Sequence, residues 1–291
     1  MCIRDRLYIT LAALLGTCSS PPPLLEQVLE LGELRVVTRD SPVSYVEGPD
    51  GPSGPEFDLV REFASDLGVE LIIETVDSIS EIVPYVMSGK AHMAAAGLSI
   101  TESRREYLHF GYPYEMVDMH LIYKLGTGKP RRIEDVIGRP IEVMAGSSHA
   151  DMLQALSTAH PELEWTENAD AEVTDLLEKV ANEEVDFTIA DSTEFNVQRH
   201  FHPDLRVALD LELGDPIAWA FPKGSGDSLL ARADSYLIGA DREGYLARVH
   251  DRYYGHTKKF DYVGTRNSVS YTHLTLPTTC RVCRSRWSPY H

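Results

Sequence analysis

The strongest constraint on the fold is a regular alternation of strand-like and helix-like segments from about residue 24. Short apolar or β-branched runs at 33–38, 71–76 and 92–96 alternate with amphipathic segments at 56–67 and 78–87. Glycine follows both amphipathic segments, and serines that can cap a helix begin the second. This alternation predicts a βαβαβ unit, a sheet covered by helices.

A second unit with the same alternation lies between two apolar segments, 119–123 and 216–222, which we interpret as crossover strands. Its predicted elements are a strand, two helices and a strand, at residues 141–144, 150–156, 171–182 and 187–190. Two later helices, at 228–242 and 244–254, are expected to pack back onto the first unit. The second unit is therefore an insertion in the first.

We predict an α/β fold of two lobes joined by two crossover strands. The folded module is placed at residues 24–266. Lobe one is expected at about 30–117 and 221–262, and lobe two at about 122–216.

The two ends of the chain differ from the module. Residues 1–6 and 267–291 resemble translated sequencing-adapter read-through, so we exclude them from the fold. The apolar run 7–17 is too short to span a bilayer and is typical of an export signal, which a proline-rich tether at 19–23 follows. Cys18 between them fits a lipoprotein cleavage box, and the sequence leaves lipidation and an incidental cysteine equally open.

Composition excludes several classes of protein. The formal net charge is −18, and no basic stripe is present to drive nucleic-acid binding. Residues 19–279 contain no cysteine, so no disulfide framework is expected in the module. Histidine spacing places no two or three imidazoles on one face with a carboxylate, so we expect no metal and no cofactor, and His149 only to border the site. The histidines considered are His149, His160, His200 and His202.

Polar residues suited to a small ligand follow the third predicted strand. Gly97 lets the backbone approach a ligand closely, and Ser99 offers a hydroxyl. Arg104 carries a planar set of donors that matches a carboxylate. Since ligands of open α/β sheets bind at the carboxyl ends of strands, we expect a site here.

The second unit supplies the other half of the expected site. Ser147 and Ser148 follow a strand and begin a helix, where free N–H groups attract an anion. Asp191 ends another strand and can accept from an ammonium group. With Arg104 these residues form a predicted clamp for a zwitterion.

Each clamp residue also has a purely structural interpretation. Arg104 beside Arg105 can be a solvated helix charge, Ser147 an ordinary helix cap, and Asp191 a cap for the helix that begins at Ser192. The joint spacing of the three favours the clamp.

Residues 97–104 (GLSITESR) and 110–114 (FGYPY) resemble the G-x-T-x-T-x-E-R signature and aromatic tail of family 3 periplasmic solute-binding proteins, with serine at 99 and 103 as departures. The resemblance implies a type II periplasmic-binding-protein fold. It also implies that Arg104 and the helix-start serines take an α-carboxylate and that Asp191 takes the α-amino group. Residues 77–79 lack the usual aromatic platform, which leaves Tyr45 as the stacking ring.

Residues 30–266 are most similar to the amino-terminal binding module of the membrane-bound lytic murein transglycosylase F family. The segments that carry this likeness are 32–36, 97–101, 146–149, 188–194 and 255–263. In that family a lysozyme-like catalytic domain follows, whereas the segment after residue 266 here supplies no general acid for glycoside cleavage. The resemblance therefore implies a peptidoglycan lytic parent protein, of which this chain carries no catalytic part.

The resulting expectation is a monomeric sensor for an amino acid or a peptidoglycan-derived peptide in the periplasm. Association with the outer membrane would be peripheral or through a lipid anchor. Two alternatives remain open: a free binding protein of an amino-acid ABC transporter, and a cyclohexadienyl dehydratase-like enzyme using Asp191 or Glu194 as its acid.

Overall fold

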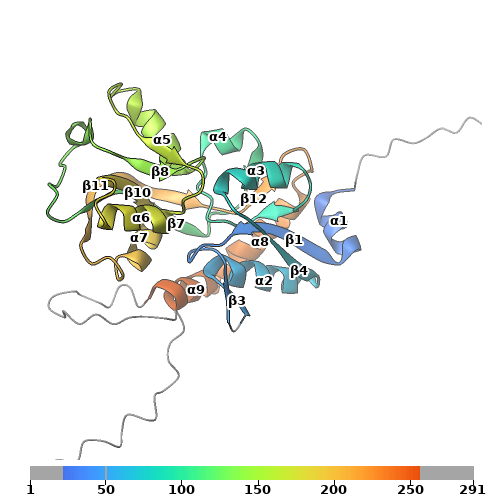
Figure 1. Ribbon diagram of the computed structural model, residues 1–291. Helices are drawn as coiled ribbons and strands as arrows, with labels where there is room; N and C mark the ends of the chain where they lie inside the picture. The colour runs from blue at the N-terminus through green and yellow to red at the C-terminus, as the bar shows by residue number, and fades with distance from the viewer. Residues whose placement is uncertain (1–21, 50, 256–291) are drawn as a thin grey trace, which may run out of the picture. The chain divides into compact units, whose positions relative to one another are not determined.

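The computed structural model describes residues 22–49 and 51–255 (Figure 1). The predictions for the export signal, Cys18 and residues 267–291 lie outside these residues, as does the stretch 256–266. The elements of the first half are α1 (Leu24–Leu31), β1 (Glu33–Arg39), β2 (Val46–Gly48), β3 (Gly51–Ser53), α2 (Pro55–Leu67), β4 (Glu70–Val76), α3 (Ile79–Met87), β5 (Met93–Ala94), α4 (Glu102–Arg105), β6 (Leu108–Phe110) and β7 (Glu115–Lys124). Those of the second half are the 3-10 turn η1 (Ile133–Val136), β8 (Glu142–Met144), α5 (Ser148–Ser157), β9 (Thr166–Asn168), α6 (Val173–Ala181), β10 (Phe187–Asp191), α7 (Ser192–Gln198), β11 (Leu205–Ile217), β12 (Ala220–Pro222), α8 (Ser228–Arg242) and α9 (Tyr245–Tyr254).

The predicted βαβαβ unit is confirmed and forms most of the first sheet. The strand order is β4-β1-β5-β12-β6, with β1 parallel to both β4 and β5 and β12 antiparallel to its neighbours. In this register Val36 lies opposite both Ile73 and Met93. The carboxyl ends of β1 and β5 are therefore neighbours, and the loops that follow them meet at one edge of the sheet.

The second sheet is built on the crossover strands. Its order is β10-β7-β11, and all its pairs are antiparallel. The register of β7 with β11 runs from Lys124 opposite Leu205 to Glu115 opposite Ile217. A bridge between Ile141 and Phe187 connects this sheet to the parallel pair of β8 and β9.

The returning crossover differs from the prediction of a single strand at 216–222. β11 begins eleven residues earlier, at Leu205, and ends at Ile217, while β12 belongs to the first sheet. The segment 205–215 alternates apolar and polar residues, the period of a strand with one covered face. We call the first sheet with α1–α4, α8 and α9 lobe one, and the second sheet with β8, β9 and α5–α7 lobe two.

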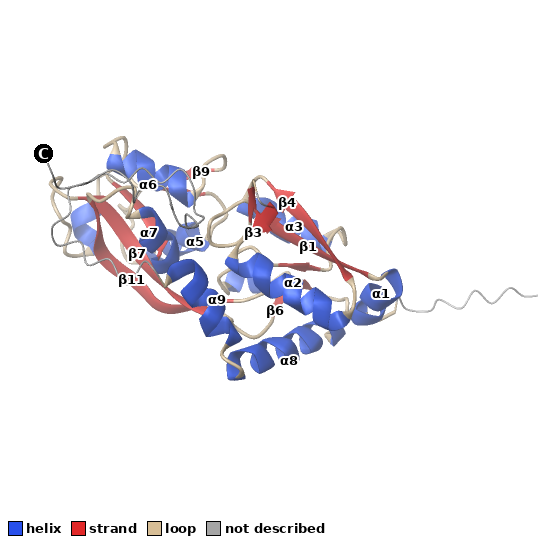
Figure 2. Ribbon diagram, turned by 90° about the horizontal axis from the view of Figure 1, so that it is seen from below, coloured by secondary structure: helices blue, strands red, loops and turns tan. Residues whose placement is uncertain are grey.

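Helix α2 shows how local sequence sets an element. It begins with Pro55 and ends at Gly68, whose φ of +71° and N–H bond to the Ala64 carbonyl close the last turn. Its apolar face includes Phe63, which packs against Tyr236 of α8. Figure 2 shows α2, α8 and α9 running beside one another, in agreement with their contacts.

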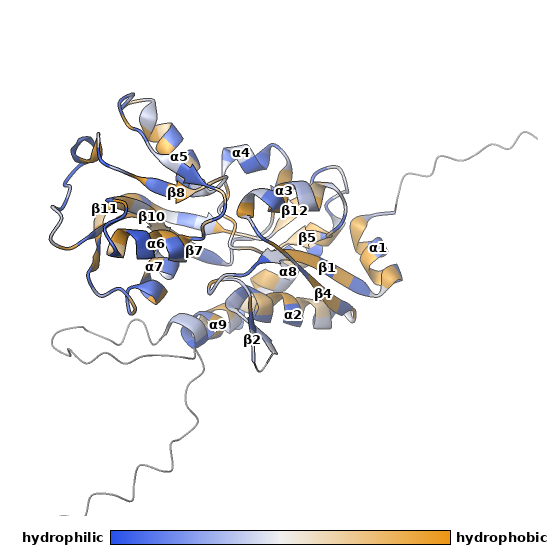
Figure 3. Cartoon of the chain, in the orientation of Figure 1, coloured by the Kyte–Doolittle hydropathy of each residue, from blue (hydrophilic) through white to orange (hydrophobic). Residues whose placement is uncertain are grey.

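Apolar packing forms three clusters of buried side chains. Trp219 belongs to the cluster of lobe one and Leu153 to that of lobe two. A third cluster brings Ile82 of lobe one together with Leu176 of lobe two, so the lobes share apolar contact. Figure 3 shows hydrophobic residues concentrated on β1 and β4, as expected for strands covered by helices.

The Trp219 side chain is the first test of this packing. It is fully buried, with the rings of Phe63 and Tyr236 at 5.5 and 6.4 Å between centroids. We expect Trp219→Ala to lower the free energy of unfolding by about 3–5 kcal/mol, because it leaves a cavity. Phe201→Ala, at a ring that is 49% exposed, should change it by about 0.5 kcal/mol or less. Urea unfolding followed by circular dichroism measures both, and equal losses would contradict this core.

Candidate functional site

Arg39 joins the two lobes at the carboxyl end of β1. Its guanidinium is almost fully buried; Nε donates to the carbonyl oxygen of Ala96 at 3.4 Å, and Nη2 donates to Oε1 of Glu194 at 3.2 Å. Nη1 forms an ion pair with Glu172, the residue before α6. The sequence analysis did not assign Arg39 or Glu172 to the site. The sequence signal that could have identified Arg39 is a cationic residue at the end of a predicted apolar strand.

Burial and charge oppose each other in this group. Burial acts to lower the pKa of Arg39, but Glu194 and Glu172 outweigh it and raise that pKa above its ordinary value. Burial raises the pKa of each glutamate, which Arg39 acts to lower. Since all three groups meet at hydrogen-bond distance, we describe them as an ion-paired set. Each charge is tolerated only because its partners are present.

Arg104 contacts both lobes, and part of its guanidinium is already bonded to the backbone. Nη1 donates to the carbonyl oxygen of Ser99 at 2.9 Å, and Nη2 donates to that of Gly146, in lobe two, at 3.3 Å. Burial lowers its pKa to about 10, against raising effects of Asp151 and Asp191. The solvated-helix interpretation is wrong, because Arg104 is 6% exposed. These bonds use two of the five N–H groups of the guanidinium.

Gly97 and Glu56 form a further hydrogen bond of the candidate site. The φ of Gly97 is +64°, a left-handed value that favours glycine, and its N–H donates to Oε2 of Glu56 at 2.7 Å. The hydroxyl of Tyr114 donates to the other oxygen of Glu56. Burial raises the pKa of Glu56 to about 7, despite these hydrogen bonds. Sequence reasoning missed Glu56, although an acid next to the proline that starts a helix was visible.

The helix-start serines of lobe two are engaged within their own lobe. The hydroxyl of Ser147 accepts from the Ala150 N–H at 3.3 Å and donates to the Met144 carbonyl at 2.6 Å. Ser147 is therefore the helix cap that its structural interpretation predicted. Ser148 is the first residue of α5 and is buried. Next to them, Gly146 comes so close to lobe one that an added Cβ would lie 3.0 Å from Cβ of Ser80.

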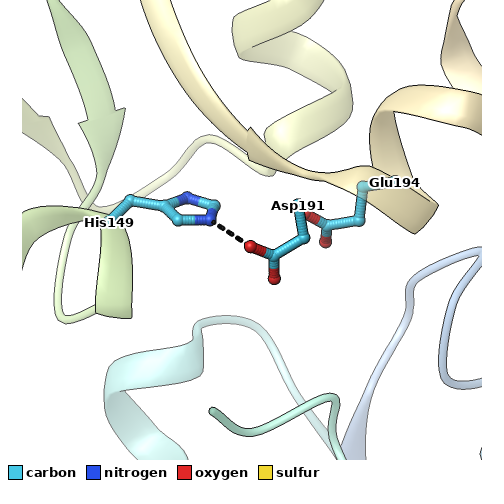
Figure 4. A group of neighbouring side chains, drawn as sticks. All are labelled: His149, Asp191 and Glu194. Carbon is cyan, nitrogen blue, oxygen red and sulfur yellow. Dashed lines mark hydrogen bonds and ion pairs between the residues drawn. The ribbon is translucent and has the colours of Figure 1, made fainter. Parts of the chain in front are cut away.

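Asp191 is the N-cap residue of α7, the position that its structural interpretation gave it, but its side chain makes no capping hydrogen bond. Its Oδ1 instead lies 3.2 Å from Nε2 of His149, and Glu194 lies beside it (Figure 4). All three residues are at least nine-tenths buried. Burial acts to lower the pKa of His149, but Asp191 outweighs it and raises the pKa overall. His149 thus contacts Asp191, one of the predicted site residues.

Tyr45 stands apart from the other predicted residues. Its ring packs edge-on against Phe57 at 5.7 Å between centroids, and its hydroxyl bonds the carboxylate of Glu47. Within the described residues, no hydrogen bond or ring contact joins Tyr45 to Arg104 or Asp191. Its contacts are those of a ring packed within lobe one.

A groove lies next to the ion pairs of Arg39. Its volume is about 320 Å³, including space open to solvent. The lining comes from the loop after β1 and from the starts of α6 and α7, namely Asp40, Ser41, Pro42, Val43, Glu172, Val173, Thr174, Glu194, Val197 and Gln198. The lining of the groove does not include Arg104 or Asp191, although Glu194, which does line it, lies near Asp191.

Two α/β lobes joined by paired crossover strands define a binding protein of the periplasmic-binding-protein type. The chain belongs to the bacterial extracellular solute-binding proteins, family 3, whose model matches residues 34–256. Among the described residues, no helix is both long and apolar enough to cross a lipid bilayer.

Curated relatives include the membrane-bound lytic murein transglycosylases F of Pseudomonas fluorescens and Ectopseudomonas mendocina. The first is 38% identical over 277 residues, which cover 95% of this chain and 57% of the relative. The second is 40% identical over 271 residues, which cover 92% of this chain and 55% of the relative. The chain thus spans little more than half the length of these relatives.

Solved structures of amino-acid-binding proteins share the fold. A mutant of ArgBP from T. maritima matches with a TM-score of 0.71 at 20% identity, covering 80% of this chain and 99% of that one. The cysteine-binding protein of Campylobacter jejuni matches with a TM-score of 0.71 at 19% identity, covering 81% and 94%. The expected type II architecture is therefore confirmed.

Glu56 generates a prediction about pH. Because its pKa is higher in the folded chain, about 7 against 4.5, the folded state binds this proton more tightly. Its contribution to stability is complete below pH 4.5 and is lost as the pH rises through 7. The slope for one proton is at most about 1.4 kcal/mol per pH unit. Glu56→Gln should lack this loss and gain stability relative to the parent between pH 4 and 8.

Unfolding in urea at several pH values measures this difference. Glu81→Gln, at an exposed position in α3, is the matched control and should run parallel to the parent. Parallel curves for Glu56→Gln would show that this carboxyl does not titrate differently on folding. Burial also raises the pKa of Glu115, to about 8. Glu115 is present in the parent and in both variants, so its titration does not affect the difference between them.

Proposed function

We propose that this chain is an extracytoplasmic binding module for a small zwitterion, either a free amino acid or a peptidoglycan-derived peptide. The observation that carries the proposal is that Arg104 and Asp191 are both buried and that Arg104 donates to carbonyl oxygens of both lobes. Asp191 also acts on Arg104 through its charge, because it helps to raise the pKa of that guanidinium. A buried cation and a buried anion that act on each other electrostatically suit the two ends of one zwitterion.

The proposed chemistry assigns one end of the ligand to each residue. The N–H groups of Arg104 that its two carbonyl bonds leave over would donate to the ligand carboxylate. The carboxylate of Asp191 would accept from the ammonium group. Ser147 contributes through the start of α5 and its backbone N–H groups, since its hydroxyl already caps the helix. A ligand held from both sides favours closure about β7 and β11.

We further propose that the module is the sensing part of a longer, lytic murein transglycosylase F-like protein. The support is that the chain is 38–40% identical to two relatives of that name, over 55–57% of their length. In such a protein, closure on a peptide released from the cell wall would control the attached enzyme. The periplasmic side of the outer membrane is the corresponding location.

A free binding protein for amino-acid transport is the second candidate. The observation in its favour is that ArgBP of T. maritima, at 99% coverage, consists almost wholly of this one module. The complete reading frame decides between the two candidates. A stop codon soon after the module supports transport, and a long continuation supports the sensor.

Isothermal titration calorimetry of the full chain tests the binding proposal, with free L-amino acids and with stem peptides as ligands. We expect one site, and a loss of about 30-fold or more in affinity for Arg104→Ala and for Asp191→Asn, because each leaves an opposite charge unpaired. Arg105→Ala is the matched control, since the neighbouring side chain is exposed and should leave affinity unchanged. The absence of binding to every ligand, or equal affinity in all three variants, would contradict the proposal.

A further inference from the structure

We propose that His149, Asp191 and Glu194 form a binding site for a divalent metal ion of the zinc class. The three side chains come from the first turn of α5, the end of β10 and the first turn of α7. One possible ligand atom of each lies within 4.8 Å of the other two (Figure 4). This site does not depend on the proposed zwitterion clamp, although it shares Asp191 with it.

The spacing of two of the ligands matches shared coordination. Nε2 of His149 and Oδ1 of Asp191 are 3.2 Å apart. Two ligands at about 2.0–2.1 Å from a tetrahedral zinc ion are separated by about 3.3 Å. An ion bound by both atoms would take the place of the hydrogen-bonded proton, and the imidazole would turn to direct Nε2 at it while the separation of the two atoms is kept. Figure 4 shows the carboxylate of Glu194 beside that of Asp191, so that Glu194 is placed to supply the third ligand atom within 4.8 Å of the other two.

The second observation is an unsatisfied oxygen. Glu194 is 9% exposed, and its Oε2 is buried without a hydrogen-bond partner. Its other oxygen, Oε1, accepts from Nη2 of Arg39 at 3.2 Å. Arg39 therefore orients the carboxylate in the way that outer hydrogen bonds orient metal ligands, and leaves Oε2 available. A buried carboxylate oxygen without a partner is costly, and a cation would satisfy it.

The charge of the group also favours a divalent cation. Glu172 and Glu194 are both paired with the guanidinium of Arg39, and the carboxylate of Asp191 lies near that of Glu194. These three carboxylates and the guanidinium of Arg39 leave two negative charges, which a proton on the imidazole of His149 reduces to one; a bound metal ion would displace that proton. The nearby Arg104 is offset mainly by Asp151. An ion of charge +2 would balance this buried group.

The donor set selects among the divalent cations. One imidazole nitrogen with two carboxylate oxygens suits Zn²⁺ and Co²⁺, while Mg²⁺ and Ca²⁺ prefer oxygen ligands alone. Three protein ligands leave a fourth tetrahedral position for water. Sequence spacing could not show this site, because His149 lies 42 residues before Asp191 in the chain.

Zinc titration of the untagged full chain tests the proposal. The chain should carry serine in place of Cys2, Cys18, Cys280 and Cys283, so that no thiolate can bind the metal. After treatment with a chelator, calorimetry with ZnCl₂ should give one equivalent, and Co²⁺ should give the visible absorption of a tetrahedral site. MgCl₂ should give no binding. We expect His149→Ala and Glu194→Gln each to weaken zinc binding by at least about tenfold.

His109→Ala is the matched control. Its Nδ1 also lies close to a carboxylate, that of Asp227 at 2.9 Å, but both side chains are exposed and the described residues offer them no third ligand. Zinc affinity should be unchanged in this variant. Circular dichroism confirms folding, and Glu194→Gln, which keeps the shape of the side chain, gives the result if His149→Ala does not fold. No zinc binding, or equal affinity in all three variants, would overturn the proposal.

Discussion

The buried guanidinium of Arg39 is the interaction on which the arrangement of the site depends. Arg39 is the last residue of β1 in lobe one. It pairs with Glu172 and Glu194, which lie at the starts of α6 and α7 in lobe two. Removing a charge of this kind from water is expensive, so the pairing is geometrically demanding and requires both carboxylates in place. The pairing therefore holds the two lobes in one relation and also fixes the side chain of Glu194.

The requirement that buried polar groups have hydrogen-bond partners also determines the rest of the site. Arg104 satisfies carbonyl oxygens from both lobes, and Glu56 satisfies the N–H of Gly97, which lies in a conformation that favours glycine. Under the proposed function, the same side chains would carry both structural and recognition roles. In the proposed function, a ligand would add its two charges to a network that already spans the interface between the lobes, with few groups left to rearrange.

Much of the fold was predictable from the sequence because its signals are local. The strands β1 and β4 and the helix α2 follow from β-branched runs, an apolar face and a glycine stop, each visible within about ten residues. Most of β11 was not predicted. Its alternating segment at 205–215 is more polar than the apolar run at 216–222, and the apolar run gave the stronger signal. For the site, Arg104 and Asp191 are both buried, and Arg104 contacts both lobes, while their role in binding stays a prediction. Tyr45 was assigned by elimination, and its ring packs on Phe57.

The sequence by itself determined the order and type of the elements and the strand ends at which polar residues collect, since periodicity, capping and turn chemistry act over short distances. Only the tertiary structure decided which charged side chains meet. The partners of Arg39 lie 133 and 155 residues away in the chain, and His149 finds Asp191 across 42 residues. The physical reason is burial. A charge must find its counterpart once packing removes water, and packing alone sets which groups lose that water together.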